Sequence, residues 1–72
     1  MVRRTKQWYS DRLSAYFGMR YGDQMSHIPH ISMPTYNKWI FNVSHRRIRV
    51  VLTCDDNGNV RETRESMRSG RY

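Results

Sequence analysis

Residues 37–60, NKWIFNVSHRRIRVVLTCDDNGNV, decide the fold because apolar and polar residues alternate along two parts of this stretch. A period of two places successive side chains on opposite faces of a β-strand. The alternation predicts one strand over residues 38–43 and a second strand over residues 47–54. One face of this strand pair is apolar and carries Trp39, Phe41, Val43, Ile48, Val50, Leu52 and Cys54.

A turn over residues 44–47 is predicted to join these strands and to fix their register. It places Val43 opposite Ile48 and Phe41 opposite Val50, so that the two apolar faces coincide. A shift of one residue would turn the apolar side chains of one strand to the opposite face. The sequence therefore predicts an antiparallel hairpin with one favoured register.

Asp56-Asn57-Gly58-Asn59 is the clearest local turn signal in the chain. Asn-Gly readily adopts the positive φ angles of a two-residue type I′ turn, which joins adjacent antiparallel strands. A third strand is therefore predicted over residues 60–65, with Val51 opposite Arg64. This strand has few apolar residues, which is typical of a solvated sheet edge.

Residues 6–20 are predicted to form a helix, with Thr5 as its N-cap and Gly22 directly after its end. One broad side of this helix is apolar and carries Trp8, Tyr9, Leu13, Tyr16, Phe17 and Met19. Residues 22–36 contain both prolines and show no periodicity, which predicts a loop. Ile28, Ile31 and Met33 are expected to reach the core from this loop.

These elements predict an α+β fold in which one N-terminal helix packs on a small three-stranded antiparallel sheet of two consecutive hairpins. Residues 1–72 form a single small domain, near the lower size limit for a fold held by a hydrophobic core alone. Segments 1–5 and 66–72 are polar and are predicted to be flexible tails.

The chain is strongly basic. Thirteen Lys and Arg residues against six Asp and Glu residues give a net charge of +7, and eleven of the thirteen are Arg. Arginine pairs bidentately with phosphates and carboxylates, so this bias favours a partner that carries such groups. Net charge bears on partners and encounter rates and does not define the fold.

The single cysteine, Cys54, excludes an intramolecular disulfide. Small secreted domains usually need such bridges, so the sequence favours a reducing, cytoplasmic compartment. No apolar stretch is long enough to span a membrane, and the basic start of the chain is not followed by the apolar region of a signal peptide.

The predicted sheet places basic side chains on the face opposite the apolar one. The residues expected on this face are Lys38, Asn42, Arg47, Arg49 and Arg64, with Arg46 in the adjoining turn. Arg3, Arg4 and Lys6 form a short basic arm ahead of the helix. A dense positive surface of this kind predicts binding of DNA or RNA, although a solvated face without a dedicated partner would show the same pattern.

Metal binding and catalysis have little support in the residues. Zinc sites usually contain paired Cys or Cys/His spacings, whereas His27, His30, His45 and Cys54 show no such spacing. The few acidic residues fall in a predicted turn and on a solvated strand, and no nucleophile is placed beside a base. We therefore expect a protein without catalytic residues, metal or cofactor.

Two functions from different classes remain open. The first is a small non-enzymatic regulatory protein that binds nucleic acid through the arginine-rich face and the N-terminal arm. The second is a regulator of the kind carried by viruses or plasmids, which docks on an acidic protein surface and inhibits transcription or replication machinery such as RNA polymerase. Homodimerisation is compatible with either function.

Overall fold

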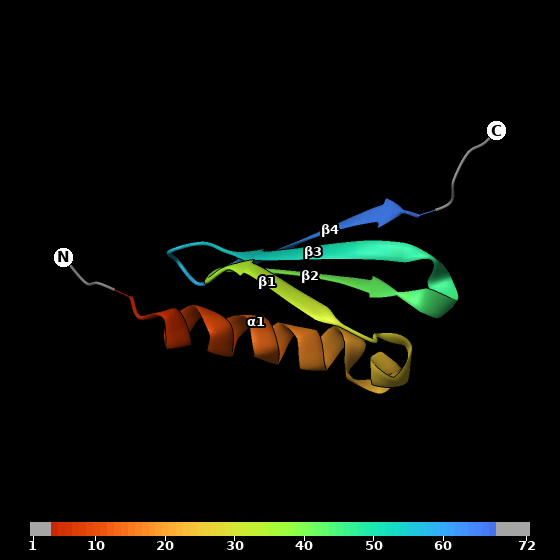
Figure 1. Cartoon of the computed structure of the whole chain (residues 1–72). Coiled ribbons are helices and arrows are strands. Elements are labelled where there is room, and N and C mark those ends of the chain that lie inside the picture. Colours follow the sequence, from red (N-terminus) through yellow and green to blue (C-terminus); the bar gives the residue numbers. More distant parts are fainter. Residues whose placement is uncertain (1–3, 68–72) are drawn as a thin grey trace.

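The structure is a computed structural model that describes residues 4–67, in which one helix lies along one face of an antiparallel sheet (Figure 1). The elements in chain order are α1 (Lys6–Tyr21), a 3₁₀-helix η1 (Gly22–His27), β1 (Ile31–Thr35), β2 (Lys38–Val43), a 3₁₀ turn η2 (Ser44–Arg46), β3 (Ile48–Cys54) and β4 (Val60–Ser66). The strands are ordered β1-β2-β3-β4 in the sheet. The predicted α+β class is confirmed, whereas the predicted number of three strands is wrong.

The additional strand, β1, lies in the segment predicted to be a loop. Ile31 pairs with Phe41 and Ser32 pairs with Ile40, and the register then shifts before the pair of Thr35 with Lys38. Pro34 lies within β1, and proline is tolerated there because β1 is an edge strand. A short strand that contains a proline shows no clear alternation of apolar and polar residues, so the sequence did not predict it.

The hairpin of β2 and β3 has the register predicted from the sequence. Val43 pairs with Ile48 and Phe41 pairs with Val50. The turn between the strands ends at Arg47, whose φ of 53° and ψ of 46° lie in the left-handed region. Arg47 therefore belongs to the turn and does not project from the sheet face, which corrects its predicted position.

Between β3 and β4, the last hydrogen-bonded pair is Asp55 with Asn59, and the loop that this pair closes has three residues instead of the two expected for a type I′ turn. The Gly58 N–H donates to the Asp55 carbonyl at 3.0 Å, and the Asp55 N–H donates to the Asn59 carbonyl at 3.0 Å. Within residues 4–67, the positive φ values belong to Arg47 and to Gly58 at 87°, so this connection has one positive φ. This is the pattern of a type I turn followed by a glycine bulge.

The Asp55 side chain explains why this turn forms. Its Oδ1 atom accepts hydrogen bonds from the N–H groups of Asn57 and Asn59, each at 2.9 Å. Aspartate at the first position of a type I turn commonly makes such contacts. The extra loop residue moves the register by one, so that Arg64 lies opposite Val50 and not opposite Val51.

The start and end of α1 agree with the sequence prediction. Thr5 is the N-cap, and its hydroxyl oxygen accepts from the Trp8 N–H at 3.1 Å. Gly22 follows the last helical residue, and its N–H donates to the Gly18 carbonyl. Met19 belongs to the apolar side of the helix expected from the sequence, but it is 76 % exposed and lies outside the core.

The core lies between α1 and the sheet face toward it. Phe17 is its centre, because its ring centroid lies 5.0 Å from that of Phe41 and 5.8 Å from that of Trp39. Edge-to-face contacts of this kind add to the burial of aromatic area. The buried residues are Tyr9, Leu13, Phe17, Tyr21, Ile28, Trp39, Phe41, Val43, Val50, Leu52 and Cys54. Met33 is 58 % exposed and was wrongly expected in the core.

Candidate nucleic-acid interface

In the described part of the chain, α1 covers one face of the sheet and leaves the opposite face, here called the outer face, open to solvent (Figure 1). The cross-strand pairs arrange its side chains in three rows. The rows are Lys38, Thr53 and Arg61; Ser32, Ile40, Val51 and Thr63; and Asn42, Arg49 and Glu65. Neighbouring strands lie about 4.8 Å apart, so Lys38 and Arg61, two strands apart, are separated by about 10 Å.

The outer face carries three cations and one anion. Arg49 Nε lies 3.2 Å from Glu65 Oε1, and both side chains are more than half exposed. Exposed pairs of this kind contribute about 1 kcal/mol or less. Lys38 and Arg61 form no ion pair within residues 4–67, so they are available to an anionic ligand. The exposed pair of Arg49 is weak enough for a phosphate to replace Glu65.

Arg61 was not identified from the sequence because the predicted register was displaced by one residue. That displacement put Arg64 on the outer face and Arg61 on the face toward the helix, whereas the structure has the opposite arrangement. The sequence did contain a signal for the correct register, since Asp55 precedes the turn at the position typical of a type I turn. The structure therefore replaces Arg64 with Arg61 in the candidate interface.

Arg64 instead belongs to a hydrogen-bonded cluster that joins β4 to α1. Its Nε atom donates to Glu62 Oε2 at 2.7 Å, and the Glu62 side chain is only 8 % exposed. The Tyr16 hydroxyl donates to Glu62 Oε1 at 2.7 Å, and the Tyr21 hydroxyl donates to Glu62 Oε2. Arg20 lies 3.7 Å from the same carboxylate.

Burial by itself would raise the pKa of Glu62. The hydrogen bonds from Tyr21, Tyr16 and Arg64 outweigh this effect and lower the pKa to about 2. The pKa of Tyr21 is raised to about 12, first by burial and then by its hydrogen bond to Glu62. The cluster therefore holds its charge over the whole neutral pH range and fixes the position of β4 against α1.

The remaining predicted residues lie at the two ends of the sheet. Arg46 and Arg47 are in the turn between β2 and β3. Arg4 and Lys6 are at the start of α1, beside the turn between β3 and β4, because Arg4 Nε donates to the Asp56 carbonyl at 3.3 Å. Of the predicted set, Lys38, Asn42 and Arg49 share the outer face, and Arg3 lies outside the described residues.

Two basic residues near the start of α1 lie against the Trp8 ring. The guanidinium carbon of Arg4 lies 4.2 Å from the centroid of the Trp8 ring, and that of Arg12 lies 4.8 Å from it. Such cation–π contacts contribute about 0.5–1 kcal/mol at exposed sites. Arg12 also packs against the turn, because a Cβ atom on Gly58 would lie 2.8 Å from its Nε atom.

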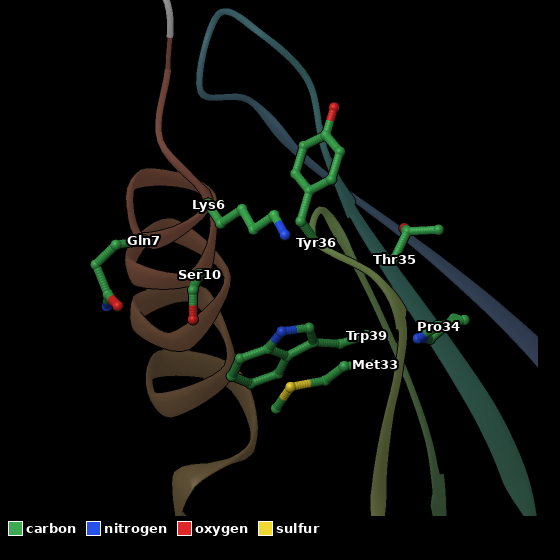
Figure 2. Close-up of a pocket in the computed structure, with 8 residues that line it drawn as sticks. All are labelled: Lys6, Gln7, Ser10, Met33, Pro34, Thr35, Tyr36 and Trp39. Carbon is green, nitrogen blue, oxygen red and sulfur yellow. The ribbon is translucent and has the colours of Figure 1, made fainter.

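A groove of about 400 Å³ lies between the start of α1 and strand β1 (Figure 2). Trp39 and Met33 extend toward the helix, and Lys6 reaches toward Tyr36 at one end of the groove. Tyr36 is 51 % exposed, and its ring makes an edge contact with Tyr9 at a centroid distance of 4.8 Å. The groove combines apolar walls with one cation, which suits an apolar group beside an anionic one.

Residues 4–67 contain no group of three or more His, Cys, Asp and Glu side chains that could hold a metal ion. His27 and His45 do meet, with ring centroids 4.0 Å apart. Burial and then the neighbouring His27 lower the pKa of His45. Cys54 lies in the core, where burial raises the pKa of its thiol, so the reactive thiolate is disfavoured.

The chain matches no protein-family model, no curated protein and no solved structure. None of the helices formed by residues 4–67 has the length and apolar character needed to cross a membrane.

Proposed function

We propose that this protein is a non-enzymatic basic module that binds nucleic acid through the outer face of its sheet. The observation that carries the proposal is the row of Lys38, Thr53 and Arg61, with Arg49 in a further row of the same open face. Cations on a flat surface bind phosphates, and nearby hydroxyl and amide groups add hydrogen bonds to the backbone. Ser32, Thr53, Thr63 and Asn42 are the polar neutral residues available for such contacts.

The composition of the outer face favours contacts with the phosphate backbone over contacts with bases. Its three rows contain aliphatic residues at Ile40 and Val51 and no aromatic residue within the described chain. Sheets that bind single strands usually stack bases on aromatic side chains. We therefore expect duplex DNA to bind at least as tightly as single-stranded RNA of equal length, with little sequence preference.

The cluster around Glu62 offers no general acid or base for catalysis near neutral pH. General acids and bases work best when their pKa lies near the operating pH. The pKa of Glu62 is lowered to about 2, and that of Tyr21 is raised to about 12. Both groups therefore keep one protonation state at neutral pH, as expected for residues that hold the fold together.

The proposal is tested with two double variants of equal charge. Lys38→Gln with Arg61→Gln removes two outer-face cations, and Arg46→Gln with Arg47→Gln removes two from the turn; each lowers the net charge from +7 to +5. Binding of a short DNA duplex is followed by tryptophan fluorescence at several salt concentrations. The outer-face variant should flatten the log–log salt dependence by about 1.8, at about 0.9 per phosphate contact.

The turn variant should bind nearly as wild type does. Equal losses of binding affinity in the two variants would show that net charge alone governs binding. A loss of affinity confined to the turn variant would show that the interface lies at residues 44–47. Either result would overturn the outer-face assignment. Unchanged far-UV circular dichroism in both variants would show that the fold is intact.

The second candidate function is docking on an acidic protein surface, and the groove in Figure 2 favours it. Tyrosine, tryptophan and methionine are enriched at protein interfaces, and Tyr36, Trp39 and Met33 line this groove. Tyr36→Ala removes one aromatic wall of this groove, and because the Tyr36 ring also packs on the buried Tyr9, the variant must first show unchanged circular dichroism. A protein that is captured after nuclease treatment by wild type and not by this variant would support docking at the groove.

A further inference from the structure

Strands β1 and β4 form the two edges of the sheet, and β4 is the more regular edge. β1 has five residues, contains Pro34 and pairs irregularly with β2. β4 has seven residues and pairs with β3 in one continuous register from Val60 to Ser66. A long, regular edge is able to pair with another strand, whereas a proline and a bulge oppose such pairing.

The ladder between β3 and β4 shows which backbone groups of β4 point to the open edge. The Asp55 N–H donates to the Asn59 carbonyl, and the Met67 N–H donates to the Arg47 carbonyl at 2.9 Å. In an antiparallel pair, alternate residues direct their N–H and C=O groups to the same neighbouring strand. The odd-numbered residues of β4 therefore face β3, and Glu62 and Arg64 direct their backbone groups to the open edge.

The backbone groups that point to the open edge restrict the registers in which β4 strands of two copies can pair by two-fold symmetry. Pairs that exchange backbone hydrogen bonds must form between even-numbered residues of the two copies. Centring the pairing on Glu62 would place two glutamates opposite each other, and centring it on Arg64 would place two arginines opposite each other. Like charges directly opposite one another destabilise a sheet.

Centring the pairing on Thr63 satisfies both the backbone and the charges. Glu62 of each copy then lies opposite Arg64 of the other, in a hydrogen-bonded pair. Arg61 of each copy lies opposite Glu65 of the other, on the outer face. Residues 61–65 read Arg-Glu-Thr-Arg-Glu, so an antiparallel copy of this segment places a glutamate opposite each arginine. A two-fold interface requires such self-complementarity.

The helix side of the same edge presents an apolar surface. A groove of about 530 Å³ runs between α1 and the start of β4, and Trp8, Ala15, Met19 and Val60 line it. Met19 is 76 % exposed although it is a large apolar residue. A second copy paired at β4 would bring its own helix to the same side of the sheet and would cover part of this groove.

We propose that the β4 edge is a homodimer interface in which two copies pair antiparallel about Thr63 to form one eight-stranded sheet. The two outer faces then lie on the same side and join into one surface, because pairing within a sheet preserves the face of each residue. Each copy contributes Lys38 and Arg49 to this surface. The interface rests on the geometry of β4 and does not depend on nucleic-acid binding.

Sedimentation equilibrium in the absence of nucleic acid tests this interface. Over about 1–300 µM, the range in which edge pairing of moderate affinity is measurable, the wild-type mass should rise from 8.8 kDa toward twice that value. Arg61→Glu puts two glutamates opposite each other at both ends of the interface and should weaken dimerisation about tenfold or more. Glu65→Arg should do the same through two arginines.

The double variant Arg61→Glu with Glu65→Arg restores opposite charges in the same register and should restore the wild-type dissociation constant. Arg46→Glu is the control, because it makes the same charge change in the turn between β2 and β3. The proposal would be overturned if the wild type stayed monomeric or if Arg61→Glu did not weaken the dimer. It would also be overturned if Arg46→Glu weakened the dimer as much as Arg61→Glu does, or if the double variant stayed monomeric. Dimerisation without nucleic-acid binding would overturn the proposed function alone.

Discussion

Glu62 is a buried charged residue whose contribution to stability follows from its contacts. Its carboxylate is 8 % exposed and is bonded by Tyr16, Tyr21 and Arg64. These partners lower the pKa from an ordinary 4.5 to about 2. A shift of this size corresponds to roughly 3 kcal/mol of folding free energy at neutral pH.

Glu62→Gln keeps the shape of the side chain and removes its charge. The amide also places a donor group where the tyrosine hydroxyls donate, so we expect the free energy of unfolding at pH 7 to fall by about 2–3 kcal/mol. That is a large part of the total expected for a domain of this size, about 5 kcal/mol. Glu65→Gln is the matched control. Glu65 forms only an exposed ion pair, so this variant should lower the free energy of unfolding by less than about 1 kcal/mol.

The pH dependence of the stability difference between wild type and Glu62→Gln tests this more specifically than the difference at pH 7. Because folding lowers the pKa of Glu62, its contribution is fully present above about pH 5 and is lost as the pH falls toward 2. Urea unfolding followed by tryptophan fluorescence should therefore show a gap between wild type and Glu62→Gln that closes between pH 5 and pH 2. A gap that stays constant over this range, or one no larger than that of Glu65→Gln, would refute the reasoning.

Four further predictions concern two positions of the turn between β3 and β4, one position of α1 and a buried tyrosine. Gly58→Ala should lower the free energy of unfolding by about 1–2 kcal/mol, because φ is +87°; the contact of the new Cβ with Arg12 adds little, since the end of that side chain can move. Gly18→Ala, whose new Cβ meets no atom within 4 Å, should raise the free energy of unfolding by up to about 1 kcal/mol, as thermal unfolding would show. Asp55→Ala should cost about 1 kcal/mol in the same assay, while Asp55→Asn keeps the oxygen that accepts two backbone N–H groups and should cost less. The tyrosinate absorbance of wild type should contain a titration near pH 12 from two tyrosines, Tyr9 and Tyr21, and Tyr21→Phe should remove about half of its amplitude. A loss of amplitude near pH 10 instead would show that the Tyr21 hydroxyl is not held as described.

The parts of the fold that were predicted correctly are those specified by local chemistry. Thr5 and Gly22 mark the ends of α1. The Thr5 hydroxyl oxygen accepts from the Trp8 N–H, and the Gly22 N–H donates to the Gly18 carbonyl, with Gly22 itself in a right-handed helical conformation. The register of β2 and β3 followed from matching two apolar faces, since a shift would have exposed one of them.

The errors have two physical causes. β1 was missed because a short edge strand containing Pro34 has neither the alternation nor the composition of a central strand. The register of β4 was displaced by one residue because Asn57-Gly58 suits both a two-residue turn and the observed three-residue turn. The Asp55 side chain favours the latter through its bonds to two backbone N–H groups.

That single displacement moved every side chain of β4 to the opposite face and is the main reason the candidate site was only partly predicted. Arg61 and Glu65 lie on the outer face, and Glu62 and Arg64 lie toward the helix. Lys38, Asn42 and Arg49 were placed correctly because they belong to the hairpin whose register the apolar residues determine.

The salt dependence of nucleic-acid binding by the wild-type protein tests the central proposal most directly. A short DNA duplex and a single-stranded RNA of equal length are titrated against the protein between about 50 and 200 mM salt, with tryptophan fluorescence as the signal. Three outer-face cations, Lys38, Arg49 and Arg61, predict a log–log slope of about −2.7 for the duplex. Absence of binding at the lowest salt, or binding that does not change with salt, would contradict the proposal that the outer face binds phosphates.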